Sequence, residues 1–145
     1  MAAFTTCRRV AAALLLTCGI AAAQEETTSS VLDGVYTDAQ AAHGAQAYGE
    51  SCALCHGATL GGIGEAPALV GGGFISDFNG LTVGDLFERI RTSMPLNNPG
   101  GLSRAQYSDI LAFVLKANGF PSGSRELYQR TEYLNVIRFE APRSP

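Results

Sequence analysis

The pentapeptide Cys52-Ala53-Leu54-Cys55-His56 constrains this chain more than any other segment. Two thiols stand three positions apart, and an imidazole follows the second thiol directly. Each thiol can add to one vinyl group of a single porphyrin, and the adjacent histidine can then bind the iron as an axial ligand. A C-x-x-C pair alone also occurs in thioredoxin-like redox sites and in half zinc sites. The added histidine predicts one haem c, attached through Cys52 and Cys55.

Residues 1–23 have the pattern of a cleaved secretory signal. Arg8 and Arg9 are followed by the apolar run 10–20 and by three alanines that end at Ala23. The apolar run is shorter than the ~20 residues that a membrane-spanning helix needs. We therefore expect cleavage after Ala23 and a periplasmic location, because c-type haem in bacteria is attached outside the cytoplasm. A twin-arginine signal is the alternative interpretation of the arginine pair.

Removal of the signal changes the cysteine count and the charge. Cys7 and Cys18 would leave, so that Cys52 and Cys55 are the remaining thiols. Lipid modification of Cys18 is an alternative, although Thr17 is a poor residue to precede such a cysteine. The formal charge of −3 would become −5, with 8 basic and 13 acidic residues left. The sequence shows no basic block for nucleic acid and no second apolar run for a membrane span.

The remaining chain is predicted to be all-α, with main helices at about 38–50, 82–92 and 103–117. Thr37 is expected to cap the first helix in a capping box in which the Gln40 side chain reaches back. Apolar residues then follow at helical spacing in all three segments. The length suits one small domain.

Three segments follow the predicted signal. Residues 24–36 form a leader that is polar and flexible in its first part. One small domain spans 37–121, and its glycine-rich part at 57–80 is expected to form loops without a long regular element. Residues 122–145 form a charged, irregular tail whose scattered apolar residues predict partial packing on the domain.

Iron that is bound by His56 has a sixth coordination position to fill. After removal of the signal the chain holds one methionine, Met94, and one other histidine, His43. His43 lies on the helix that leads into the motif and is interpreted as a solvated helix residue. Met94 precedes Pro95 and should lie just past a helix end. A thioether favours ferrous iron and raises the reduction potential, so we predict Met94 as the second metal ligand. Ordinary core packing of Met94 is the alternative.

An axial histidine usually donates its other ring N–H to a carbonyl or carboxylate group. Pro67 lies in the segment Ala66-Pro67-Ala68-Leu69, and its fixed φ makes it a stiff carrier for such a carbonyl. A simple turn proline is the alternative. The chain lacks tryptophan, so the candidate donors to the haem propionates are Arg89, Arg91 and Tyr107.

From about 37 to 121 the chain resembles a class I monohaem cytochrome c of the bacterial periplasm. The resemblance includes the C-x-x-C-H motif, the segment that contains Pro67 and Leu69, the Met-Pro pair, and the last helix with Phe113. It implies three helices wrapped around one haem, with Pro67 and Leu69 as cofactor-binding residues. It also implies a close contact between Gly44 and Phe113 where the first and last helices cross. The region 67–119 is similar to cytochrome domains that accompany quinoprotein alcohol and sugar dehydrogenases.

These features predict an electron-transfer protein that is not itself an enzyme. The expected partners are redox proteins, with a dehydrogenase or respiratory donor and an oxidase acceptor. One alternative is a cytochrome subunit bound tightly to a periplasmic dehydrogenase. Another is a haem peroxidase or gas sensor, in which Met94 would leave the iron. A zinc module built from Cys52, Cys55, His56 and His43 is the alternative without haem.

Overall fold

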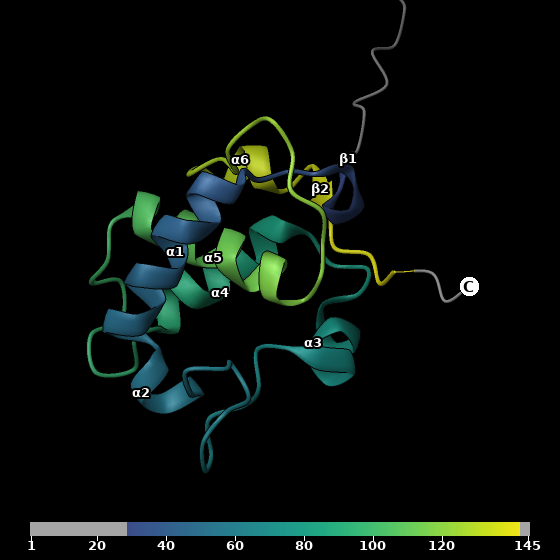
Figure 1. The fold of residues 1–145 in the computed structure, drawn as a ribbon. Helices are drawn as coiled ribbons and strands as arrows, with labels where there is room; N and C mark the ends of the chain where they lie inside the picture. The colour runs from purple at the N-terminus through teal and green to yellow at the C-terminus, as the bar shows by residue number, and fades with distance from the viewer. Residues whose placement is uncertain (1–28, 143–145) are drawn as a thin grey trace, which may run out of the picture.

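The computed structural model describes residues 29–142 and places six α-helices in that range (Figure 1). The predicted signal 1–23 and the start of the predicted leader lie outside the described residues. The helices are α1 (Asp38–Ser51), α2 (Ala53–His56), α3 (Gly71–Phe78), α4 (Val83–Ser93), α5 (Arg104–Ala117) and α6 (Thr131–Leu134). A 3-10 turn covers Val31–Asp33, and the short strands β1 (Ser29–Ser30) and β2 (Ile137–Arg138) pair in parallel. No helix within the described part of the chain is both long and apolar enough to cross a lipid bilayer.

The two longest helices, α1 and α5, pack directly against each other in the middle of the molecule (Figure 1). Gly44 of α1 lies at the contact, where a Cβ atom would stand 1.8 Å from the carbonyl oxygen of Asp109. The nearest atoms to Gly44 thus belong to the backbone of α5. The ring of Phe113, expected beside Gly44, pairs with the ring of Tyr48 at a centroid distance of 5.3 Å. The absence of a side chain at Gly44 is what lets the two backbones come so close.

The three predicted main helices appear, and a side chain caps the first turn of each. Thr82 begins α4 in a complete capping box, and Ser103 begins α5 in another. Thr37 caps α1 by accepting the N–H of Gln40, but the Gln40 side chain does not reach back. The predicted capping box is wrong at this helix because the Gln40 amide has buried partners on other elements.

The glycine-rich segment 57–80 contains a helix, α3, where the sequence predicted only loops. Phe74 and Phe78 lie one turn apart on α3, and both are buried. Their rings stand 6.1 Å and 5.9 Å from the ring of Phe139 in the tail. This aromatic cluster stabilises a helix that the propensity of its glycines disfavours.

The predicted leader is partly a packed element. Ser29–Ser30 forms β1, and the side chains of Val31 and Tyr36 are buried. The Tyr36 hydroxyl donates to the carbonyl of Phe120 at 2.6 Å. Apolar side chains and a long-range strand partner therefore bring residues 29–36 into the core, although their local composition predicted a leader.

The tail after Pro121 is also more regular than predicted, because it contains α6 and β2. Its buried side chains are those of Leu127, Leu134, Ile137 and Phe139. A buried polar contact fixes its start: the Gln40 amide donates to the Leu127 carbonyl at 3.1 Å and accepts the Leu127 N–H at 2.7 Å. Ser108 of α5 also donates to that carbonyl, at 2.9 Å. The tail is thus tied to both α1 and α5.

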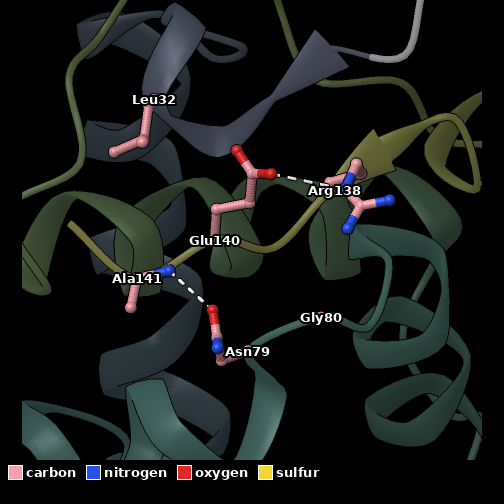
Figure 2. A pocket seen from close by; sticks show the side chains of 6 residues that line it. All are labelled: Leu32, Asn79, Gly80, Arg138, Glu140 and Ala141. Carbon is pink, nitrogen blue, oxygen red and sulfur yellow. Dashed lines mark hydrogen bonds and ion pairs between the residues drawn. The ribbon is translucent and has the colours of Figure 1, made fainter. Parts of the chain in front are cut away.

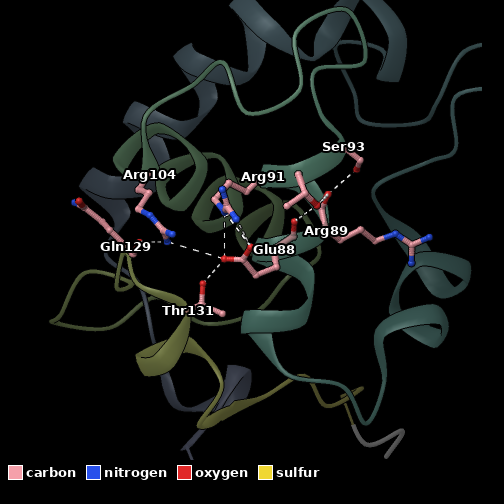
Figure 3. A network of polar contacts seen from close by, with 8 residues as sticks. Glu88, Arg89, Arg91, Ser93, Arg104, Gln129 and Thr131 are labelled. Carbon is pink, nitrogen blue, oxygen red and sulfur yellow. Dashed lines mark hydrogen bonds and ion pairs between the residues drawn. The ribbon is translucent and has the colours of Figure 1, made fainter.

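A polar network around Glu88 joins α4 to α5 and α6 (Figure 3). The Glu88 carboxylate accepts from Arg91, with a shortest N–O distance of 2.6 Å, and from the Thr131 hydroxyl. Arg104 of α5 lies 4.0 Å from the same carboxylate. The hydrogen bonds from Arg91 and Thr131 hold the pKa of Glu88 below its usual value. The helix that ends at the predicted methionine ligand is therefore fixed to its neighbours on this side.

Candidate functional site

The C-x-x-C-H motif occupies the junction between α1 and α2. Cys52 ends α1, where its N–H donates to the Tyr48 carbonyl at 2.8 Å, and it also begins α2. Gly57 is the C-cap residue of α2, which is a single turn long. Its φ is +78°, a conformation that favours glycine. Both thiols are free, with Cys52 half-buried and Cys55 exposed. The motif is thus held by a helical turn, and its two sulfur atoms are available for covalent attachment.

Tyr48 fixes the residue that follows the motif histidine. Its hydroxyl donates to the Gly57 carbonyl at 2.7 Å. Burial, together with the nearby Cys52, raises the pKa of Tyr48 to about 12. Burial also raises the pKa of the Cys52 thiol, and Cys55 adds to that rise. The Tyr48 phenol is therefore protonated at neutral pH and keeps its donor role.

His56 has a hydrogen-bond partner of the kind that an axial histidine usually has. Its ring is buried, and Nδ1 lies 2.9 Å from the carbonyl oxygen of Pro67. A carbonyl only accepts hydrogen bonds, so Nδ1 must carry the proton. In the neutral ring Nε2 then keeps its lone pair for a metal. The structure brings these two predicted residues together.

The loop 57–70 owes its shape to short backbone contacts. The N–H of Gly62 donates to the His56 carbonyl at 2.8 Å, and the N–H of Leu69 donates to the Leu60 carbonyl at 2.7 Å. Gly62 has a φ of +78°, and a Cβ atom there would lie 2.4 Å from the Ala66 carbonyl oxygen. The loop therefore folds closely on itself, which holds the Pro67 carbonyl against the imidazole.

Asn118 ties this loop to the end of α5. Its side-chain Nδ2 donates to the carbonyl of Leu69 at 2.9 Å, and its Oδ1 accepts the N–H of Gly71 at 3.0 Å. Leu69 is half-buried and packs on the core. In the sequence, the pair Asn118-Gly119 is typical of a helix end. The Asn118 side-chain amide can both donate and accept hydrogen bonds, and this was the sequence feature from which a contact with a second segment could have been predicted.

Met94 is the C-cap residue of α4, as its place before Pro95 predicts. Its N–H donates to the Ile90 carbonyl at 2.9 Å, and its side chain is half-buried. Its carbonyl accepts the Tyr107 hydroxyl at 2.7 Å. His43 is exposed on α1, as a solvated helix residue would be. Met94 is thus linked to α5 through Tyr107, a contact that sequence reasoning missed.

The three candidate propionate donors have other partners in the structure. Tyr107 uses its one hydroxyl proton on the Met94 carbonyl. Arg91 is bound to Glu88, and the Arg89 guanidinium lies 5.9 Å from the centre of the Phe78 ring. Tyr107 is therefore better assigned to the loop after α4 than to a propionate.

The donor set fits a covalently attached haem. Two free thiols, an imidazole with an available Nε2 and a thioether are the ligands and attachment groups that haem c uses. Large apolar side chains lie in solvent near these groups in the sequence: Leu54 inside the motif is 91% exposed, and Leu96 after Met94 is 79% exposed. Ile63, in the loop that holds Pro67, is 59% exposed. Within residues 29–142, no three His, Cys, Asp or Glu side chains are placed to hold a metal ion, so the zinc alternative finds no ligand cluster there.

Two pockets among the described residues are lined by residues other than the predicted ligands. One, of about 290 Å³, lies beside β2 and is lined by Leu32, Asn79, Gly80, Arg138, Glu140 and Ala141 (Figure 2). Hydrogen bonds cross part of it, including the one from the Ala141 N–H to the Asn79 side-chain oxygen at 2.9 Å. A second is lined mainly by residues of the first described turn and the tail. The candidate site is therefore defined by its donor atoms.

A match to a known protein family agrees with the donor set. The family model described as cytochrome c oxidase, cbb3-type, subunit III matches residues 39–114, which are 76 of the 145 residues. The sulfane dehydrogenase SoxCD from Paracoccus pantotrophus is a similar solved structure, with 22% identity, coverage of 86% of this chain and 68% of that chain, and a TM-score of 0.49. A search of curated proteins finds no match. The chain thus belongs to the family of cbb3-type cytochrome c oxidase subunit III domains, and it is a class I monohaem cytochrome c.

Proposed function

We propose that this chain is a periplasmic one-electron carrier whose haem c is bound by His56 and Met94. Family membership implies a haem c cofactor and a role in electron transfer. The observation that carries the finer proposal is the contact between His56 Nδ1 and the Pro67 carbonyl at 2.9 Å. That contact selects the tautomer whose Nε2 binds iron.

Each residue has a defined task in this proposal. Cys52 and Cys55 form the two thioether links, and His56 and Met94 fill both axial positions. The haem supplies the one-electron Fe(III)/Fe(II) couple, while the protein supplies ligands and an apolar surround. With both axial positions filled, no coordination position is open to a substrate. This supports electron transfer without bond chemistry.

Redox partners would meet the apolar surface beside the motif. Leu54 and Leu96 are exposed in the segments that carry the attachment site and the predicted sulfur ligand, and Ile63 is exposed in the loop that holds Pro67. Exposed apolar groups of this kind mark interaction surfaces. Electron-transfer contacts are often small and short-lived. A dehydrogenase or respiratory donor and an oxidase acceptor therefore suit a shuttle of this size.

A tightly bound subunit of a periplasmic dehydrogenase is the second candidate. Tyr128 and Tyr133 of the tail are each 49% exposed, and their rings lie 5.1 Å apart. Tyrosine is enriched at protein interfaces. Copurification of the chain with dehydrogenase activity would favour this candidate, whereas a monomer that exchanges freely between partners would favour the shuttle.

Visible spectra of protein matured with the haem-attachment machinery test the proposal. The wild type should show a c-type spectrum and, when oxidised, a sulfur-to-iron absorption band. Met94→Ala should lose that band, lower the midpoint potential and admit external ligands, while the haem stays attached. Leu96→Ala, an exposed change in the same loop, is the matched control and should keep the band.

Two results would contradict the proposal. If Met94→Ala keeps the band and the wild-type potential, Met94 is not a ligand. If Cys52→Ala together with Cys55→Ala still retains haem through denaturation, attachment does not use these thiols. Fast binding of carbon monoxide to the ferrous wild type would instead support a gas sensor or peroxidase.

A further inference from the structure

We propose that Tyr107 is a positioning residue for Met94. Its hydroxyl holds the loop that carries the predicted sulfur ligand, and this contact keeps external ligands away from the sixth coordination position. The inference rests on the proposed function, because it takes Met94 as the iron ligand.

The loop 94–102 connects α4 to α5 and is largely exposed. Leu96, in its middle, has 79% of its surface in solvent. Two local turns give the loop its shape: the Asn98 N–H donates to the Pro95 carbonyl at 2.8 Å, and the Gly101 N–H donates to the Asn98 carbonyl at 3.0 Å. Both of these bonds lie inside the loop, so they do not fix its place against the helices.

Among the hydrogen bonds of residues 29–142, those that tie this loop to helices are found at its two ends. At the first end the Met94 N–H donates to the Ile90 carbonyl at 2.9 Å, and the Met94 carbonyl accepts the Tyr107 hydroxyl at 2.7 Å. At the other end the Leu102 N–H lies 3.5 Å from the same hydroxyl oxygen, which makes a weaker contact. One hydroxyl thus meets both ends of the loop.

The position of that hydroxyl is set by packing. The Tyr107 side chain is 2% exposed, and its ring meets the fully buried ring of Phe87 edge-on, with centroids 6.5 Å apart and an interplanar angle of 83°. Phe87 belongs to α4 and Tyr107 to α5, so the contact between these helices aims the hydroxyl at Met94. Phenylalanine at 107 would keep the ring contact and remove only the hydroxyl.

External imidazole is a suitable probe because it binds ferric haem only after Met94 has left. The free energy needed to move Met94 off the iron includes the loss of the hydrogen bond from Tyr107 to the Met94 carbonyl. A net hydrogen bond is worth up to about a tenfold change in an equilibrium constant. Tyr107→Phe should therefore raise the affinity for imidazole about tenfold, measured as loss of the sulfur-to-iron band.

Tyr36→Phe is the matched control. The Tyr36 hydroxyl is also buried and also donates to a backbone carbonyl, that of Phe120 at 2.6 Å, beyond the other end of α5. Its loss should cost similar stability and leave imidazole affinity unchanged. Equal changes in both variants, or no change in Tyr107→Phe, would overturn the positioning role.

Met94→Ala separates this inference from the proposed function. If Met94→Ala keeps the sulfur-to-iron band, Met94 is not the ligand and both proposals are wrong. If that band is lost but Tyr107→Phe binds imidazole like the wild type, only the role of Tyr107 is wrong.

Amide hydrogen exchange can be measured on the wild-type protein, so this test does not require a substituted protein to fold. The Leu102 amide should exchange more slowly than the amide of Leu96, for which the described structure records no acceptor. Equally fast exchange of the two amides would contradict the contact between the Leu102 N–H and the Tyr107 hydroxyl.

Discussion

The Nδ1 atom of His56 lies 2.9 Å from the carbonyl oxygen of Pro67. Eleven positions separate the two residues, and the turns of the loop 57–70 bring them together. The contact fixes both the tautomer and the plane of the imidazole, which are the properties that set its strength as a ligand.

Gly62→Ala should break this contact. A Cβ atom at Gly62 would lie 2.4 Å from the carbonyl oxygen of Ala66 and 2.9 Å from the carbonyl carbon of Pro67, so the loop must move. With the left-handed φ added, we expect a loss of about 3 kcal/mol in the free energy of unfolding. The midpoint potential should rise, because an imidazole without its acceptor is a weaker donor to Fe(III).

Gly64→Ala is the control for this loop. Gly64 also has a positive φ, +59°, but a Cβ atom there would meet nothing within 4 Å. Its cost should be about 1 kcal/mol of backbone strain, with no change in potential. Equal potentials in Gly62→Ala and Gly64→Ala would show that the Pro67 contact does not tune the iron.

Gly44→Ala should separate α1 from α5. Its Cβ would stand 1.8 Å from the Asp109 carbonyl oxygen, which belongs to a helix backbone and has little room to move. We expect a loss of about 3 kcal/mol or more in urea unfolding. Gly49→Ala, on an open face of the same helix, should gain about 0.5–1 kcal/mol from helix propensity. Similar stabilities of the two variants would contradict the close crossing.

Gln40→Ala should loosen the tail. The substitution removes the side-chain donor to the Leu127 carbonyl and the side-chain acceptor of the Leu127 N–H. The buried Leu127 N–H is then left without an acceptor. The expected cost is about 2 kcal/mol in the free energy of unfolding. Gln46→Ala changes an exposed glutamine on the same helix, bonded to Glu50, and should cost less than about 0.5 kcal/mol. Faster proteolysis of residues 122–142 in Gln40→Ala alone would locate the effect.

Glu88→Gln should make the protein less sensitive to acid. The pKa of Glu88 is lowered in the folded state by hydrogen bonds from Arg91 and Thr131. A lowered carboxyl pKa gives stability that is present above the usual pKa of 4.5 and is lost as pH falls through the folded value. Urea unfolding at pH 7 should thus show the variant less stable, with the difference shrinking below pH 4.5.

Glu126→Gln is the control for this network, since it removes a carboxylate for which the described residues record no ion pair. It should destabilise the protein at pH 7 less than Glu88→Gln does. A stability difference between Glu88→Gln and the wild type that stays constant with pH would mean that the network around Glu88 contributes nothing to the acid response.

Much of the local structure could be predicted from the sequence. Thr82 and Ser103 each precede an acidic or amide residue by three positions, and both begin helices with complete capping boxes. The position of Met94 at the end of α4 follows from Pro95. These predictions succeed because each depends on residues within one or two helical turns.

The elements that the sequence did not reveal depend on distant partners. α3 forms in a glycine-rich segment because Phe74 and Phe78 pack on Phe139, more than sixty positions away. The Gln40 side chain does not form the expected capping box, because it bonds Ser108 on α5 and Leu127 in the tail.

The amino-acid sequence by itself determined that the chain carries a haem c attachment motif, because two thiols and an imidazole stand within five residues. Only the tertiary structure decided which groups orient those residues. Pro67, Asn118 and Tyr107 act through hydrogen bonds to residues that are distant in the sequence. Such bonds exist only after α1, α4 and α5 have packed and set the distances between them.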